Sequence, residues 1–171
     1  MIRFAWFPGP RHAPEWGERV VEIFRRHEKE ISPGRGPALA SQEVLQVLAS
    51  DLRQAGFVIE RRKLAAGAPG LPGSQAILAR EQFDVFHPEW LCCLAIEAGP
   101  RGSASETDGA LVEPLLVVDM DTLCLALPNA APKSPQPGAE VHDYDSACAL
   151  AQKVYAHARV KLPRRLLLLG Y

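Results

Sequence analysis

Residues 83–99, which read FDVFHPEWLCCLAIEAG, decide the fold predicted for this chain. Two apolar runs, 83–87 and 91–97, flank a short Pro-Glu-Trp turn, and so short a connection predicts a pair of antiparallel strands. Each strand carries one acid, because Asp84 lies in the first and Glu97 ends the second. A carboxylate in such an apolar strand needs a hydrogen-bond partner or a cation, since burying it bare is costly. Two acids on neighbouring strands therefore indicate a site for a hard divalent ion, which prefers oxygen ligands.

Regular elements are predicted on both sides of this hairpin. Upstream, the patterns predict a strand at 3–7, helices at 14–31 and 41–55 (the second capped by Ser41), a strand at 57–61, and a flexible Gly/Pro/Ala-rich excursion at 65–74. Downstream they predict a loop at 100–107, a helix through about 118, a strand at 123–127, a Pro-rich loop at 128–138, a helix at 144–158 and a strand at 166–169. Helices on the faces of one sheet bury these patterns economically, so we predict an α/β fold with a mixed sheet of about five or six strands.

The composition is that of an ordinary globular protein. Hydrophobic residues make up 47% and charged residues 23% of the chain. Its length of 171 residues is enough for a single domain with a hydrophobic core. The net charge is −1, so nucleic-acid binding would need a local basic patch. No apolar stretch has the length of a membrane span, and the first residues lack the layout of a signal peptide. We therefore expect a cytoplasmic protein without a membrane partner.

The cysteine pattern favours reduced thiols. The four cysteines form no CxxC motif, and no histidine pair stands at zinc-finger spacing, so a zinc site is not expected. Three of them lie in apolar strand runs, where a cysteine behaves as a small hydrophobic residue. We predict no disulfide among the four, since neighbours on one strand point to opposite faces. They are Cys92, Cys93, Cys124 and Cys148.

From residue 41 onward the predicted order is helix, strand, strand, strand, helix, strand. With Asp84 in the second core strand and Glu97 ending the third, this order resembles the PD-(D/E)XK nuclease fold of restriction and repair endonucleases. The resemblance implies a restriction-endonuclease-like core at roughly 41–128 within one domain over 1–171. A strand and helix would extend that core at its N-terminal side, and a helix and strand at its C-terminal side.

The resemblance also implies a catalytic metal site. Asp84, Glu97 and the backbone carbonyl of Ala98 would hold Mg²⁺ or Mn²⁺, and Glu43 on the first core helix would complete the ligand set. Clustered carboxylates suit phosphodiester hydrolysis, because the bound ion neutralises developing charge and lowers the pKa of the attacking water. Glu43 has a second explanation, since the helix dipole favours an acid in the first turn without any function.

One position departs from the family pattern. The motif reads Glu-x-Lys in the family, whereas Glu97 and Ala98 are followed here by Gly99. Either another cation replaces the lysine, with Arg101 and Lys63 as candidates, or the site is degenerate.

The resemblance implies DNA as the substrate, and a basic cluster offers a place to contact it. Arg61, Arg62 and Lys63 follow the strand beside the predicted metal site, and basic residues there could contact phosphates. We therefore expect a metal-dependent nuclease acting on DNA, with a homodimer left open as its assembly. The alternative is a catalytically degenerate nuclease scaffold that serves as a nucleic-acid-binding or partner-binding subunit.

Overall fold

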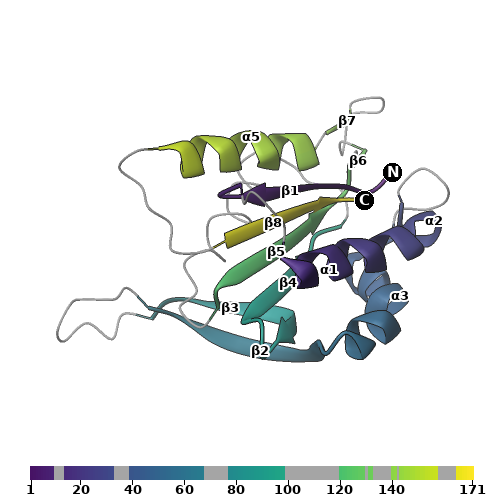
Figure 1. Cartoon of the computed structure of the whole chain (residues 1–171), viewed down its shortest axis with the longest axis horizontal. Helices are drawn as coiled ribbons and strands as arrows, with labels where there is room; N and C mark the ends of the chain where they lie inside the picture. The colour runs from purple at the N-terminus through teal and green to yellow at the C-terminus, as the bar shows by residue number, and fades with distance from the viewer. Residues whose placement is uncertain are drawn as a thin grey trace.

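A six-stranded mixed sheet forms the centre of the structure (Figure 1). The computed structural model describes residues 1–9, 14–32, 39–67, 77–98, 120–129, 131–132, 140–141, 143–157 and 165–171. The strands there are β1 (Arg3–Phe7), β2 (Val58–Gly67), β3 (Ile77–His87), β4 (Cys92–Ile96), β5 (Thr122–Leu127), β6 (Ala131–Pro132), β7 (Glu140–Val141) and β8 (Arg165–Gly170). The helices are α1 (Glu15–Arg26), α2 (Glu28–Ile31), α3 (Ser41–Gln54) and α5 (Asp143–Ala156).

The sheet combines an antiparallel half with a parallel half. Its strand order is β1-β8-β5-β4-β3-β2, while β6 and β7 form a separate two-stranded ladder. The predicted antiparallel pair is confirmed, because β3 and β4 pair with Val85 opposite Leu94. β2 also runs antiparallel to β3, whereas β4, β5 and β8 are parallel to one another. The edge strand β1 pairs antiparallel with β8, which brings the two chain ends side by side (Figure 1).

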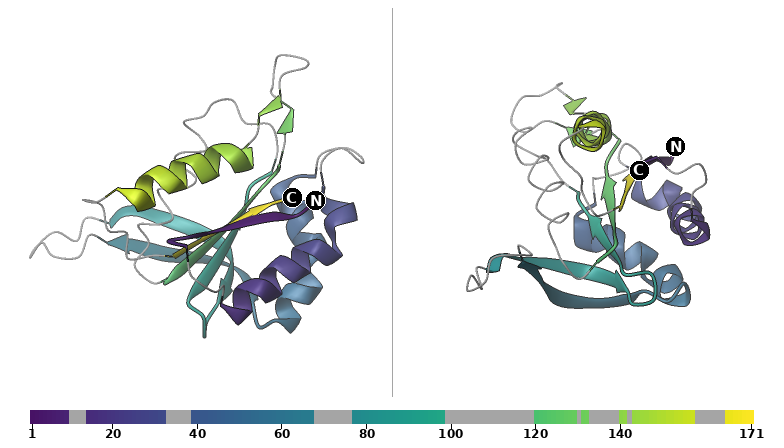
Figure 2. Two further views of the ribbon diagram at one scale, coloured as in Figure 1. Left: turned by 45° about the horizontal axis from the view of Figure 1, so that its top comes forward. Right: turned by 60° about the vertical axis from the view of Figure 1, so that its left-hand side comes forward.

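Helices cover the two faces of the sheet (Figure 2). On the first face, buried side chains of α1 and α3 such as Phe24 and Leu48 pack with Val85, Leu94 and other strand residues. On the second face, the buried Ala147 of α5 packs with alternate residues of the same strands. We call these the α1/α3 face and the α5 face. Among the described helices, none is both long and apolar enough to cross a membrane.

The prediction of one continuous helix over 14–31 was wrong at His27. That residue has φ −99° and ψ 9°, so α1 ends at Arg26 and the short α2 begins at Glu28. The His27 ring nitrogens lie 3.5 Å from a Glu30 carboxylate oxygen and 3.6 Å from one of Asp51. The bend lets Ile31, only 2% exposed, join the core beside α3.

β2 and β3 are both longer than the strands predicted at 57–61 and 83–87, and they pair with each other. Pairing continues beyond residue 61 to Ala66 opposite Ala79, so the first part of the predicted excursion at 65–74 is strand. Alanine and glycine have low strand propensity, but the ladder with a partner strand outweighs it. The rest of the excursion, the predicted loop at 100–107 and the predicted helix to about 118 lie outside the described residues.

The turn between β3 and β4 is held by one histidine in a defined tautomer. Nε2 of His87 lies 3.0 Å from the Ala55 carbonyl, which can only accept, and Nδ1 accepts the Trp90 N–H at 3.2 Å. The neutral ring also stacks on Trp90, with centroids 3.5 Å apart. Burial lowers the pKa of His87, an effect partly opposed by the hydrogen bond to Ala55. Protonation of Nδ1 would remove the acceptor for Trp90.

We expect His87 to make the protein less stable in acid. Because its pKa is lowered on folding, the unfolded chain binds the proton first as pH falls below about 6.5. The stability that neutral His87 contributes to the folded state is therefore complete above that pH and declines below it. Thermal unfolding measured from about pH 7.5 to about pH 5 should show a steeper loss of Tm for the natural protein than for His87→Gln. Equal slopes would contradict this assignment.

All four cysteines are free thiols. Sγ of Cys92 lies 3.4 Å from Sγ of Cys124, a thiol–thiol contact between neighbouring strands. Burial raises the pKa of Cys92 well above its ordinary value, so this thiol stays protonated at neutral pH. The pair therefore packs as part of the core on the α1/α3 face.

Candidate functional site

Glu97 lies where the chain leaves the sheet after β4, and it is half-buried. Its backbone N–H donates to the Ala126 carbonyl of β5 at 2.9 Å. Its carbonyl accepts a hydrogen bond from the Tyr171 hydroxyl, also at 2.9 Å. Both backbone polar groups of Glu97 are thus bonded to other segments, which fixes the position from which its side chain departs.

The next residue contacts the start of α3. The backbone N–H of Ala98 donates to Oγ of Ser41 at 2.9 Å. The prediction that Ser41 caps this helix was wrong, because Ala40 is the N-cap and Ser41 is the first helical residue. The Ser41 hydroxyl faces the end of β4 instead.

Glu43 lies two residues further along α3, hence near the same end of the sheet. Its side chain is exposed, and Oε2 accepts the Ala40 N–H at 2.7 Å. This bond satisfies one of the free N–H groups at the helix start, which explains an acid here without a metal. A ligand role for Glu43 stays a prediction.

Asp84 lies in β3, on the strand next to the one that ends at Glu97. The structure describes only the backbone of this residue. The register sets Val85 opposite Leu94 as the last pair of β3 with β4, so position 84 comes directly beyond the paired stretch. On the other side, the pairing with β2 is irregular between Ile59 and Arg62, directly across from position 84. Such bulges occur preferentially next to active sites and at sheet edges.

The predicted basic residues are described only in part. Arg61, Arg62 and Lys63 belong to β2, where Lys63 pairs with Gln82, and nothing beyond their backbone is described. Gly99 and Arg101 lie outside the described residues. Their predicted roles therefore stay predictions.

The side chains that the structure describes include no group of three His, Cys, Asp or Glu residues placed to hold a metal ion. The side chain of Asp84 is not among those described. The donors that the fold brings to the end of β4 are carboxylate and carbonyl oxygens, the ligand types that suit Mg²⁺ and Mn²⁺.

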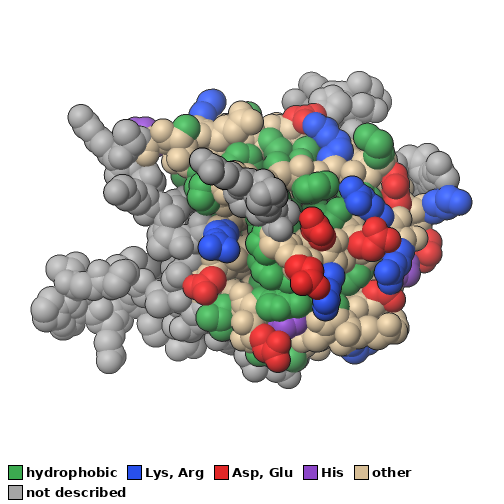
Figure 3. Space-filling model, viewed as in Figure 1, with side chains coloured by type: hydrophobic (Ala, Val, Ile, Leu, Met, Phe, Trp, Pro, Cys, Tyr) green, Lys and Arg blue, Asp and Glu red, His purple; other side chains and the backbone are tan. Residues whose placement is uncertain are grey.

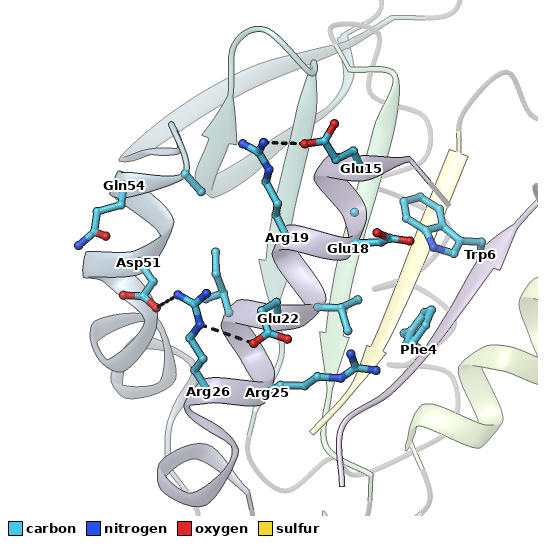
Figure 4. Close-up of a pocket in the computed structure, with 14 residues that line it drawn as sticks. Phe4, Trp6, Glu15, Glu18, Arg19, Glu22, Arg25, Arg26, Asp51 and Gln54 are labelled. Atoms are coloured by element: carbon cyan, nitrogen blue, oxygen red, sulfur yellow. Dashed lines mark hydrogen bonds and ion pairs between the residues drawn. The ribbon is translucent and has the colours of Figure 1, made fainter. Parts of the chain in front are cut away.

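A hollow of about 630 Å³ lies beside α1, lined by residues of β1, α1 and α3 (Figure 4). Most of its charges pair with one another: Arg19 bonds Glu15 at 2.7 Å, and Arg26 lies 3.6 Å from Glu22 and 3.4 Å from Asp51. Acidic and basic side chains are interspersed on this face of the molecule (Figure 3). Glu97 does not line this hollow. Most of the charged side chains that do line the hollow pair with one another, so we assign the hollow no chemistry.

Comparisons with known proteins add no relative. The sequence matches no protein-family model, and no curated protein matches it.

Two residues that contact the end of β4 from other elements were not predicted as part of the site. Tyr171 hydrogen-bonds Glu97 across 74 residues of sequence, and Ser41 bonds Ala98 across 57. Neither contact has a local sequence signal. The strand order, which places β8 beside β5 and β5 beside β4, brings Tyr171 to this strand end, and the packing of α3 against β4 brings Ser41 there.

Proposed function

We propose that this chain is a cytoplasmic, metal-dependent, nuclease-like protein that hydrolyses DNA phosphodiester bonds on a restriction-endonuclease-like core. The placement of Asp84 and Glu97 on adjacent antiparallel strands carries the proposal. If the register continued by one residue beyond the Val85–Leu94 pair, position 84 would face Ala95 and Glu97 would be its diagonal neighbour. Residues so related lie roughly 7–8 Å apart at Cα, and we expect by strand alternation that both belong to the α5 face.

The order of elements gives independent support. From residue 41 the described elements follow as α3, β2, β3, β4 and β5. These five agree with the helix–strand–strand–strand–helix–strand order of the resemblance except for its second helix, whose expected position lies outside the described residues.

The residues at this end of the sheet suit a hard divalent ion. Glu97 and the Ala98 carbonyl would bind it together with Asp84. Glu43 lies on α3, which covers the opposite α1/α3 face, so it would have to leave its bond to Ala40 and reach around the end of β4 to join them. A bound ion would supply charge neutralisation at the scissile phosphate and a lowered pKa for the attacking water. The chain's own role is to hold these oxygens on a rigid strand end.

The lysine missing at Gly99 needs a substitute. Arg101 and Lys63 are the candidates, since a cation there would orient the water and stabilise negative charge. Arg61 and Arg62 would contact the DNA backbone, because arginine binds phosphate in a bidentate manner.

The second candidate function is a nuclease scaffold without catalysis, acting as a nucleic-acid-binding or partner-binding subunit. Gly99 favours it, because glycine offers no side chain at the motif position. The two carboxylates favour the enzyme, since a degenerate site has no need to keep them.

The test combines cleavage with metal binding. Purified protein is incubated with single-stranded, double-stranded and branched DNA in Mg²⁺, Mn²⁺, Ca²⁺ or EDTA, and Mn²⁺ binding is measured by calorimetry. We expect cleavage with Mg²⁺ or Mn²⁺ alone. A folded protein that binds Mn²⁺ yet cuts none of these substrates would leave the scaffold function. A protein that binds no Mn²⁺ would remove the metal site altogether.

A further inference from the structure

We infer that Tyr171 and Ser41 are positioning residues that hold the Glu97–Ala98 peptide and so orient the Glu97 carboxylate for metal binding. The inference rests on the proposed function and adds to it two residues that the resemblance does not supply.

The two side chains hold opposite ends of one peptide group. The carbonyl of Glu97 and the N–H of Ala98 belong to the same planar unit. The Tyr171 hydroxyl donates to that carbonyl at 2.9 Å, and Oγ of Ser41 accepts that N–H at 2.9 Å. Rotating this peptide would break both bonds, which come from the start of α3 and from the residue that follows β8.

The preceding peptide is fixed as well. The N–H of Glu97 continues the ladder with β5 through the Ala126 carbonyl. The Cα of Glu97 therefore stands between two peptide groups that each have bonded partners. With φ and ψ of Glu97 restricted in this way, the direction in which its carboxylate leaves the strand is set.

Tyr171 is itself held rigidly. Its N–H donates to the Leu127 carbonyl at 3.0 Å, and its carbonyl accepts the Asn129 N–H at 2.7 Å. Its ring is 2% exposed and packs against Phe24 of α1, with centroids 6.2 Å apart. The hydroxyl is therefore delivered to Glu97 from a fixed ring.

Ser41 is equally well placed. It begins α3, a helix whose next turns bury Val44, Leu45 and Leu48 in the core. Its hydroxyl is not used to cap its own helix, because Ala40 is the N-cap. It is available to the end of β4 for that reason. Partners of this kind, which orient metal ligands without touching the metal, typically change affinity by about 10–100-fold when removed.

The first experiment removes the tyrosine hydroxyl. Tyr171→Phe keeps the buried ring, so the packing against Phe24 is retained. We expect the calorimetric Mn²⁺ affinity to fall about tenfold, and the Mn²⁺ concentration for half-maximal cleavage to rise by the same factor. At saturating Mn²⁺, kcat should return to within about twofold of the natural value, because only the ligand geometry has changed. Tyr155→Phe is the matched control, since the Tyr155 ring stacks on Phe7 of the edge strand β1, which β8 and β5 separate from β4.

The second experiment tests the serine. Ser41→Ala should weaken Mn²⁺ binding in the same way and speed the hydrogen exchange of the Ala98 amide. Ser41→Thr keeps a hydroxyl and should restore both properties. A faster Ala98 exchange with unchanged Mn²⁺ affinity would overturn the inference, because the contacts would then be structural alone. Absence of Mn²⁺ binding in the natural protein would instead refute the proposed function, and the positioning roles with it.

Discussion

Replacing Glu97 by glutamine should lower metal-dependent DNA cleavage on the order of 100-fold or more while leaving the protein folded. Glutamine keeps the size of the side chain and one acceptor oxygen, but it removes the negative charge that a hard divalent ion requires. The backbone bonds of Glu97 to Ala126 and Tyr171 do not involve the carboxylate, so the strand end should keep its conformation. Asp84→Asn should have an effect of similar size. Initial rates in Mg²⁺ and far-UV circular dichroism are the measurements.

A matched control lies in the same hairpin. Glu89 is exposed in the turn between β3 and β4, so Glu89→Gln makes the same chemical change away from the site. It should leave the rate unchanged, whereas residual cleavage by Glu97→Gln purified in the same way would reveal any contaminating nuclease. Without metal, Asp84→Asn should raise Tm slightly, since it removes one of two carboxylates that repel each other. Full activity in both Asp84→Asn and Glu97→Gln would place the chemistry elsewhere.

The strands that were predicted most accurately are the apolar ones. Phe4 and its neighbours form β1 over the predicted residues, and β4 and β5 differ from prediction by no more than one residue at each end. Their buried side chains determine them locally, because a near-continuous apolar run has few other ways to be buried. The length of β2 was underestimated, since Ala65 and Ala66 acquire strand geometry only from pairing with β3.

The candidate site divides in the same way. The pairing of β3 with β4 follows from one short turn, so it could be predicted from seventeen residues of sequence, while the proximity of the Asp84 and Glu97 side chains stays a prediction. The contacts of Ser41 and Tyr171 with that strand end depend on the order of strands across the whole sheet. A serine before a helical pattern usually indicates an N-cap. That expectation for Ser41 gave no sign of its long-range hydrogen bond with Ala98.

The turn that ends α3 offers a test of the fold. At Gly56 the steric cost of adding a side chain can be separated from the conformational cost. Gly56 has φ +93°, a conformation that residues with a side chain rarely adopt. The N–H of Gly56 donates to the Arg53 carbonyl, and the N–H of Phe57 donates to the Leu52 carbonyl. These two hydrogen bonds form the Schellman pattern that ends many helices. A Cβ at position 56 would lie 2.7 Å from Nε2 of His87. Gly56→Ala should therefore lower the free energy of unfolding by about 2–4 kcal/mol, measured by urea denaturation.

Two further variants divide this loss into its causes. Gly9→Ala is the control, because a Cβ there would meet only the Trp6 carbonyl at 3.9 Å, and it should cost less than about 0.5 kcal/mol. In a His87→Ala background the imidazole is gone, so Gly56→Ala should cost about 1 kcal/mol or more less than in the natural protein. The cost that remains is the positive φ alone. An undiminished cost would mean that the imidazole moves aside freely, and would contradict the rigid hydrogen-bonded position of His87 between Ala55 and Trp90.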